Sequence, residues 1–415
     1  MTDQEKRLKE CRTKCHFCGV QEVSPILDFG LQPLCNRFIV ELGAEEFTHP
    51  LTLGKCHYCG LLQLVYPVPP SEITPRVDWL SYTEPESHLD DLADCLARLP
   101  NLPQAPIVCG VSHKDDSLLS RLTKKGLSSW RIDTQADLGL KRGGLSVETV
   151  IPRLTPRTIE SIKNSRGRVD ILLARHALEH ATDPRTFIDG IKGLLKPNGY
   201  IVFEVPDCTS RIQSKDYSMV WEEHISYFVP GTFRRILKVC DLSLFDYRSY
   251  PYPIEDVLIA IVRVGAEAST WEKFRHSEDK QDEACLYANK FHDFKAQVRE
   301  DLKKLKANNG RIAVFGAGHT SAIFINIMEI QDLVEFVVDD NPNKHSLYMP
   351  GSALQIKPSE SLVAKRIDYC LLTQNPESEK VVVKRNKEFV NGGGIFGSIS
   401  PQSRNFFANI TRSEF

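Results

Sequence analysis

Apolar runs and amphipathic stretches alternate between residues 105 and 265, and this pattern predicts strands and helices in turn. The predicted strands cover 105–111, 128–135, 169–176 and 199–207, and the predicted helices cover 116–126 and 183–199. Two further apolar segments, 242–250 and 256–265, would complete the sheet. This order is typical of a doubly wound α/β sheet, in which ligands lie beyond the carboxyl ends of the strands.

A second α/β segment follows a long polar stretch, 269–310, which predicts a solvated linker helix. The segment "RIAVFGAGHTSAIFINIM" predicts a strand, a glycine turn and a helix, and "VEFVVDDNPNK" predicts another strand that ends at Asp339 and Asp340. Gly316 and Gly318 could let the backbone approach a phosphate at a helix N-terminus, although a third glycine is missing. A structural role comes first, and a nicotinamide site is the alternative.

The length of 415 residues predicts about three domains, which we place at 1–75, 76–265 and 266–415. A formal net charge of -2 gives no overall footprint for nucleic acid or for an anionic membrane, so neither is expected as a partner. The charged N-terminus lacks an apolar signal core, and no apolar run reaches the ~20 residues of a membrane span. We therefore expect a cytoplasmic protein. The composition does not predict its oligomeric state.

Four of the twelve cysteines form two C-x-x-C knuckles, each followed by glycine, at Cys15, Cys18, Cys56 and Cys59. Four thiolates satisfy the tetrahedral preference of Zn²⁺ and leave no open coordination position, so the ion would be structural. The long insert between the knuckles is expected to carry its own strands. The alternative is two unrelated cysteine pairs.

The segment "WEEHISYF", residues 221–228, places Glu222, Glu223 and His224 against apolar neighbours. A nearby carboxylate raises the pKa of an imidazole while burial lowers it, so the histidine could act as a base near neutral pH. The alternative is the start of a helix, with the two glutamates at the positive end of its dipole.

The order of the knuckles, "ILDFGLQPLCNRF", "CHYCGLLQL", "EVPD" and "EEHISYF" resembles the sugar C-methyltransferases. These enzymes methylate C3 of nucleotide-linked 4-ketodeoxysugars with S-adenosylmethionine. The resemblance implies a class I methyltransferase-like, Rossmann-type central domain between a zinc-binding N-terminal domain and a Rossmann-like C-terminal domain. It also implies that His224 is the base, with Glu223 beside it, and that His180 donates a hydrogen bond to the keto oxygen or its enolate.

The resemblance further implies contacts to the methyl donor and to the nucleotide-linked sugar. The residues implied to bind the methyl donor are Gly110, Ser112, Asp133 and His176. The residues implied to bind the substrate are Trp221, Glu222, Tyr227, Tyr82 and Asp207. Asp133 would accept bonds from ribose hydroxyls at the end of the second strand. Its alternative is a plain turn residue.

The first loop of the central domain departs from the family pattern. A donor loop normally reads like E-x-G-x-x-x-G, whereas this chain has "VCGVSHKDDSLL", with Cys109 near the acidic position and Gly110 as its only glycine. His176 stands for an asparagine of the family, and Trp221 for a tyrosine. Three functions remain open: C-methylation, an epimerase or isomerase that uses the same base without a donor, and a catalytically silent sugar-nucleotide binder.

Overall fold

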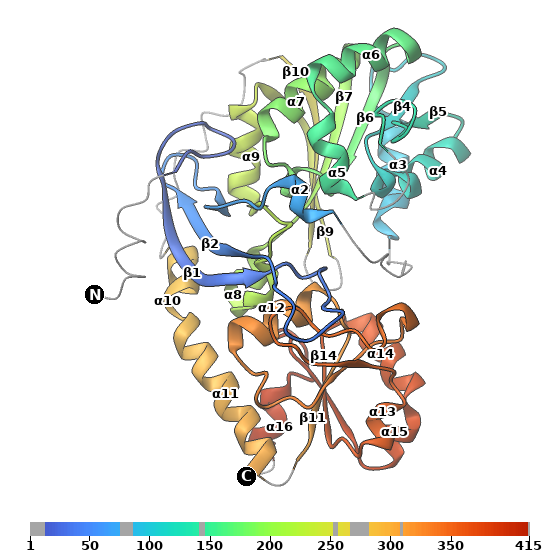
Figure 1. Ribbon diagram of the computed structural model, residues 1–415. Helices are drawn as coiled ribbons and strands as arrows, with labels where there is room; N and C mark the ends of the chain where they lie inside the picture. The colour runs from blue at the N-terminus through green and yellow to red at the C-terminus, as the bar shows by residue number, and fades with distance from the viewer. Residues whose placement is uncertain are drawn as a thin grey trace.

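The computed structural model describes residues 13–74, 86–140, 146–251, 256–265, 282–307 and 310–413. These residues contain three sheets of four, six and five strands. In Figure 1 the six-stranded sheet lies at the top, the five-stranded sheet lies at the bottom, and the N-terminal sheet lies between them at one side. Within this described part, no helix is long and apolar enough to cross a membrane.

The N-terminal sheet is antiparallel and includes one strand from far along the chain. Its order is β1 (Val23–Pro33), β2 (Thr48–Cys56), β3 (Leu62–Leu64) and β8 (Ser226–Tyr227). The strands expected in the insert between the knuckles are confirmed as β1 and β2. A short helix, α2 (Pro70–Ile73), follows the sheet. Because β8 belongs to "WEEHISYF", that segment completes the zinc-domain sheet.

The six-stranded sheet is built from the predicted alternation of strands and helices. Its order is β5 (Ser128–Arg131), β4 (Ile107–Gly110), β6 (Val169–Arg175), β7 (Leu195–Pro206), β10 (Val257–Val264) and β9 (Leu242–Tyr250). The first four are parallel, and β10 runs antiparallel to both of its neighbours. Every residue of β6 is buried, as expected of a central strand covered on both faces.

Helices cover both faces of this sheet (Figure 1). One face packs against α3 (His88–Leu96) and α4 (Asp116–Lys124). The other packs against α5 (Val147–Val150), α6 (Pro156–Arg166), α7 (Pro184–Lys192) and α9 (Pro230–Val239). The predicted helix 183–199 is too long, because α7 ends at Lys192 with Gly193 as its C-cap. Leu195 instead pairs with Val169 and begins β7.

The C-terminal sheet is entirely parallel, in the order β13 (Ile356–Lys357), β12 (Val337–Val338), β11 (Ile312–Phe315), β14 (Tyr369–Leu372) and β15 (Ile395–Ser398). Its helices are α12 (His319–Met328), α13 (Ser361–Ala364), α14 (Pro376–Arg385), α15 (Lys387–Asn391) and α16 (Phe407–Ser413). In the described part of the linker, the single predicted helix is two, α10 (Glu283–Asn289) and α11 (Phe291–Ala307).

The largest apolar core joins the N-terminal sheet to the C-terminal half. The ring of Phe29 on β1 meets the ring of Phe291 on α11 edge-on, with centroids 4.9 Å apart. Tyr217, which lies in a 3₁₀ turn (Tyr217–Met219), packs on the same Phe291 at 5.0 Å. The boundaries predicted near residues 75 and 265 fall beside stretches outside the described residues.

Candidate active site and metal centre

The two knuckles meet as the sequence predicts. The Sγ atoms of Cys15 and Cys59 lie 3.6 Å apart, as do those of Cys18 and Cys56, and all four lie within 4.8 Å of one another. Tetrahedral Zn²⁺ with bonds of about 2.3 Å separates its sulfurs by about 3.8 Å. The cysteines therefore fit a zinc ion, and a closed set of four thiolates assigns it a structural role. The glycine that follows each knuckle, Gly19 or Gly60, has a positive φ (76° and 79°), as tight knuckle turns require.

The segment 221–225 is a loop that leads into β8, and the next helix begins only at Pro230. The alternative of a helix start at Glu222 is therefore wrong. The ring of His224 lies edge-on to that of His180, with centroids 4.7 Å apart at 87°. Glu179, His180 and His224 each bring one nitrogen or oxygen within 4.8 Å of the others. The cluster combines the end of β6 with the "WEEHISYF" loop.

His180 is held by two acceptors on one ring nitrogen. Its Nδ1 lies 2.6 Å from Oε1 of Glu148 and 3.0 Å from the carbonyl oxygen of Glu223, so Nδ1 must carry a proton. Burial opposes a charge on His180, but the Glu148 carboxylate outweighs it and raises the pKa of the imidazole. Burial also works against the charge on Glu148, yet His180 lowers the pKa of that carboxyl group to about 2. The two side chains form a buried ion pair.

The His224 environment acts in the opposite direction. Burial, followed by the charges of His180 and His319, lowers the pKa of His224 well below its usual value. Across the described residues, neither ring nitrogen of His224 makes a hydrogen bond. The imidazole is thus neutral near pH 7 and has a nitrogen that can accept a proton.

The two glutamates beside His224 bind the zinc domain. Glu222 accepts bonds from the backbone N–H of Cys35 at 2.6 Å and from its thiol at 3.1 Å, and Glu223 accepts from the amide of Asn36 at 3.0 Å. Burial raises the pKa of both carboxyl groups. Tyr227 uses its hydroxyl to hold the backbone of Trp221. Glu223 therefore contacts His180 through its carbonyl, and its carboxyl group faces the zinc domain.

The C-terminal domain also reaches this cluster. The ring of His319, at the start of α12, stacks on Trp221 with centroids 4.1 Å apart and planes 22° apart. Trp221 in turn lies 5.0 Å from the ring of His224. Side chains from all three parts of the chain therefore meet around His224.

The predicted donor loop is bonded to itself. One carboxylate oxygen of Asp115 accepts from the N–H groups of Val111 and Ser112 at 2.8 and 2.9 Å. A Cβ on Gly110 would lie 2.6 Å from the Cβ of Asp115, so this glycine makes room for the aspartate. Ser112 caps the turn by accepting from the N–H of Lys114. Burial raises the pKa of Asp115 to about 7.

Asp133 lies two residues beyond β5 and shapes a turn. Its Oδ1 accepts from the backbone N–H groups of Gln135 and Ala136, at 2.9 and 2.6 Å. The side chain is exposed, and these two hydrogen bonds lower its pKa. The turn role foreseen as its alternative is thus present, and the carboxylate still faces solvent at the carboxyl edge of the sheet.

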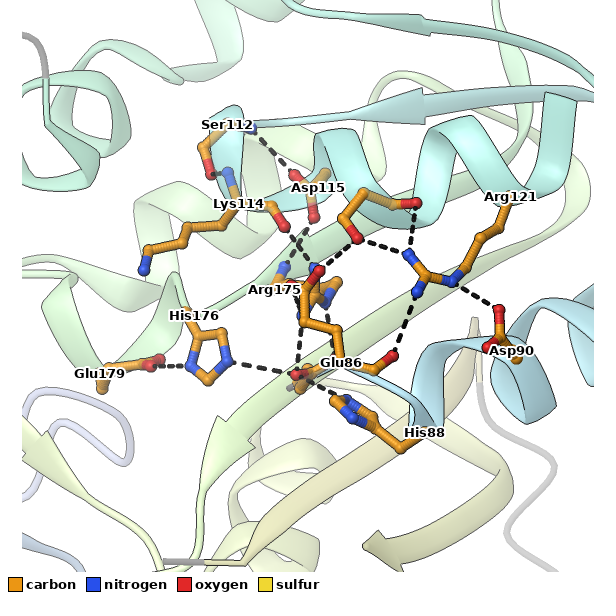
Figure 2. Close-up of polar contacts among 12 residues, drawn as sticks. Glu86, His88, Asp90, Ser112, Lys114, Asp115, Arg121, Arg175, His176 and Glu179 are labelled. Atoms are coloured by element: carbon orange, nitrogen blue, oxygen red, sulfur yellow. Dashed lines mark hydrogen bonds and ion pairs between the residues drawn. The ribbon is translucent and has the colours of Figure 1, made fainter. Parts of the chain in front are cut away.

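A buried charge network fills the neighbouring strand ends. Arg175, at the end of β6, donates from Nε and Nη2 to both oxygens of Glu204 at 2.7 and 3.1 Å, and it also donates to Glu86. Figure 2 shows Arg175 between Asp115 and Glu86, with His176 beside them. Burial opposes the charge on His176, but bonds to Glu179 and Glu204 raise its pKa to about 9. Its ring nitrogens are therefore directed to protein carboxylates.

The fold family implies S-adenosylmethionine as the methyl donor. Some of these residues fit the donor, and others are already bonded to protein groups. Asp133 fits the part of the donor that carries ribose hydroxyls, because an exposed carboxylate at this strand end can accept their bonds. The loop amides of Val111 and Ser112 are already bonded to Asp115. Arg175 and Glu204 satisfy one another at the adjacent strand ends. The residues thus fit the ribose side of the donor and depart from the usual loop contacts.

Two other predicted features serve local structure. The carboxylate of Asp207 accepts from the backbone N–H and the hydroxyl of Thr209, the first residue of α8 (Thr209–Ser214). In the C-terminal glycine turn, the N–H groups of Gly316, Ala317 and Gly318 all bond within the domain, which leaves none of them for a phosphate. Tyr82, the remaining predicted substrate residue, lies outside the described residues.

The sequence did not single out Glu148, Arg175 or His319. Glu148 follows Ser146 at the start of a four-residue helix, and no motif marks it. Arg175 is the only charged residue in an otherwise apolar strand end, "ILLAR", and that break in the pattern was a usable signal. His319 lies next to the glycine turn, but its contact with Trp221 depends on the packing of two domains.

Comparison with known proteins gives a consistent assignment. Residues 15–73 match a zinc binding domain family, residues 91–245 match the methyltransferase domain family, and residues 270–401 match the C-methyltransferase C-terminal domain family. C-methyltransferase NovU of Streptomyces niveus is 22% identical over 428 residues, covering 99% of this chain and 100% of that protein.

Solved structures resemble the chain over less than half its length. The 1,6-didemethyltoxoflavin-N1-methyltransferase of Burkholderia thailandensis is 13% identical, with a TM-score of 0.30, over 44% of this chain and 80% of that one. Magnesium protoporphyrin IX methyltransferase of Synechocystis is 13% identical, with a TM-score of 0.29, over 42% and 82%.

The three matched families follow one another in a fixed order that spans the zinc centre, the six-stranded sheet and the C-terminal sheet. The full-length likeness to a C-methyltransferase has the same extent. The protein is therefore a methyltransferase, and its three parts match, in order, a zinc binding domain, a methyltransferase domain and the C-terminal domain of C-methyltransferases.

Proposed function

We propose that this C-methyltransferase uses S-adenosylmethionine to methylate C3 of a nucleotide-linked 4-ketodeoxysugar, with His224 as the base. The observation that carries the proposal is the pairing of a neutral imidazole, His224, with an ion-paired one, His180, edge to edge at 4.7 Å. Neighbouring groups whose pKa values are driven apart are typical of an acid and a base in one site.

The residues perform proton transfer as follows. A ring nitrogen of His224 takes the C3 proton, which the neighbouring 4-keto group makes acidic. The electron pair moves into a C3–C4 double bond, and the keto oxygen becomes an enolate oxygen. The second ring nitrogen of His180, Nε2, donates a hydrogen bond to that oxygen. S-adenosylmethionine, when bound, supplies the transferable methyl group.

The surrounding side chains shield His224 from water on two sides. Trp221 and His319 stack at one side of His224, and the buried carboxyl groups of Glu222 and Glu223 close the side toward the zinc domain. A desolvated site strengthens the interaction between an enolate oxygen and its hydrogen-bond donor.

Titration calorimetry on the zinc-loaded protein tests donor use, with S-adenosylmethionine and S-adenosylhomocysteine as titrants. We expect micromolar binding, about -8 kcal/mol, and weaker binding by Asp133→Asn. Methyl transfer is then assayed with thymidine, guanosine and cytidine diphosphate 4-ketodeoxysugars. A protein that binds one of these sugars but neither form of the donor would rule out methylation.

A second candidate is an isomerase or epimerase that uses the same base without a donor. It is favoured by one observation: Asp115 occupies the loop amides of Val111 and Ser112. The enolate that the base forms gives the C3 epimer when a proton is delivered to the face opposite the one that it left. Formation of a C3 epimer without S-adenosylmethionine would favour this reaction, whereas methylated product alone would exclude it.

A further inference from the structure

Glu148 lies outside every motif that predicted the site, yet it makes the shortest contact to a site histidine. Its Oε1 atom is 2.6 Å from Nδ1 of His180. Exposed fractions are 6% for Glu148 and 9% for His180, so the pair is largely removed from water. A carboxylate in such surroundings contributes more to its partner than an exposed one, because little solvent screens the two charges.

The local structure holds Glu148 in place. It lies on α5, where its neighbours Val147 and Val150 belong to the apolar core on one face of the six-stranded sheet. These two side chains anchor the short helix, and Glu148 is thereby presented to His180. On the zinc-domain side, α5 packs against α2.

Several other charged or titratable groups influence the two histidines. Around His180 these are Glu179, which favours its charge, and Lys114, which opposes it. Around His224 they are His180, His319, His176 and Arg211, all of which oppose a positive charge. Glu148 is the strongest of the groups that favour a proton on His180. Among its neighbours, Glu148 therefore contributes most to the proton affinity of His180.

We propose that Glu148 is a positioning residue for His180, which it holds by Nδ1 and supplies with a counter-charge, so that Nε2–H is presented to the substrate oxygen. The inference rests on the proposed function and deepens it. When the C3–H bond breaks, the proton goes to His224, and the negative charge that forms on the oxygen is met by the positive charge of His180. Glu148 acts only through His180 and touches no reacting atom.

The test uses the zinc-loaded full chain and the variants Glu148→Gln and Glu148→Asp. Glu160→Gln on α6 is the matched control, because Glu160 is an exposed carboxylate that pairs with Lys163 on the same helix. Circular dichroism first establishes that each variant folds. Imidazole ¹⁵N NMR then follows the His180 ring nitrogens, assigned by comparison with His180→Gln.

Wild type and Glu160→Gln are expected to show both His180 nitrogens protonated at pH 7. In Glu148→Gln the titration midpoint should fall by at least one pH unit, which is a tenfold change in proton affinity. Glu148→Asp retains the charge and should recover part of this loss. Should Glu148→Gln not fold, Glu148→Asn, which also removes the charge, is titrated in its place. An unchanged midpoint in the variant that lacks the charge overturns the proposal.

A second readout follows exchange of the C3 proton of thymidine diphosphate 4-keto-6-deoxyglucose in D₂O without a methyl donor. Glu148→Gln should exchange at least tenfold more slowly at pH 8 and recover toward pH 6.5, where His180 regains its proton while His224 is still neutral. A loss of the same size at every pH would indicate a structural defect and overturn the proposal. If the wild type exchanges no proton, the proposed function fails, and the NMR titration still decides the role of Glu148.

Discussion

The rings of His180 and His224 touch, yet their surroundings drive their pKa values apart. His180 has a carboxylate at 2.6 Å, whereas His224 is buried among other positively charged or chargeable groups. Two adjacent imidazolium ions would repel one another in a site of low dielectric constant, so the first proton excludes the second. Glu148, on α5, therefore favours protonation of His180 over His224.

Replacing the base should abolish turnover and spare binding. We expect His224→Asn to lower kcat by about 10²- to 10⁴-fold, the usual contribution of a positioned base, with little change in the Kd for the sugar nucleotide. His292→Asn, an exposed histidine on α11, is the control and should behave as wild type. A variant that retained more than a tenth of wild-type turnover would remove His224 from the role of base.

The pH profile should show where this base titrates. Because burial and the neighbouring His180 and His319 lower the pKa of His224, the ring stays neutral as the pH falls past the usual histidine range. We expect kcat to stay level from pH 8 to pH 6.5 and to decline only below that, once His224 takes up a proton. An acid limb centred above pH 6.5 would contradict this assignment.

The motif residues lie together in the structure, and their catalytic roles stay predictions. His224, Glu223 and His180 come together as the resemblance implies. The role of Glu148 could not be predicted, because its helix reaches His180 only after the six-stranded sheet has folded. The same holds for His319, which comes to Trp221 from another domain. Contacts of this kind have no periodicity or spacing in the chain.

At the scale of elements, the carboxyl ends of β6 and β7 are joined by the Arg175–Glu204 pair. Both side chains are almost fully buried, with exposed fractions of 3% and 0%. Glu204 also accepts from His88 and His176. Such a network stabilises the fold only when every charge is paired, because removal of one partner leaves an uncompensated charge in the interior.

Breaking this pair should therefore be costly. We expect Arg175→Met to lower the free energy of unfolding by about 3–5 kcal/mol, measured by urea denaturation. Arg121→Met, which removes an exposed pair with Asp90, should cost less than about 1 kcal/mol. The double variant with Glu204→Met should be more stable than Arg175→Met alone. If all three variants cost the same, the burial of the charge is not the cause.

The zinc centre should determine whether the N-terminal sheet folds. The knuckles close the ends of β1 and β2, and structural Zn²⁺ sites contribute about 10–16 kcal/mol in small domains. We expect Cys59→Ser or treatment with a chelator to expose amides of residues 23–64 to hydrogen exchange. Cys95→Ser, a half-buried cysteine away from the knuckles, should leave exchange there unchanged. Protection that survives loss of zinc would contradict a structural role.

The alternation of strands and helices was readable because each element of the six-stranded sheet carries its own periodicity. The errors have local physical causes. The apolar pair Leu194–Leu195 continues the helical pattern, so the sequence predicts helix where β7 begins at Leu195. The sequence does not predict β8, because two residues are too few to show an alternation of apolar and polar positions. They form a strand only through pairing with β3.

At the scale of the whole molecule, one apolar core unites the N-terminal sheet with α10, α11 and the C-terminal sheet. The six-stranded sheet instead has cores of its own on its two faces, and the outer side of the C-terminal sheet has another. We therefore expect the N-terminal sheet and the C-terminal sheet to unfold together. Sequence could not predict this coupling, because the partners are separated by the entire middle domain.

Two phenylalanine truncations test the coupling. Phe291→Ala should cost about 3–5 kcal/mol, and should raise hydrogen exchange in β1 and β2 as well as in α11, since Phe291 packs on Phe29. Phe389→Ala, equally buried in the separate C-terminal core, should raise exchange only in that domain. Exchange confined to α11 in Phe291→Ala would show that the two halves open independently.

The pairing of β3 with β8 affects how the protein folds while it is synthesised on the ribosome. The zinc-binding segment emerges before the six-stranded sheet, but the fourth strand of its sheet, Ser226–Tyr227, is synthesised only after most of the six-stranded sheet. Until then the nascent N-terminal sheet has an unpaired edge at β3, and such edges invite pairing with other chains. Translation that pauses before residue 226 should therefore favour aggregation, whereas a pause after it should not.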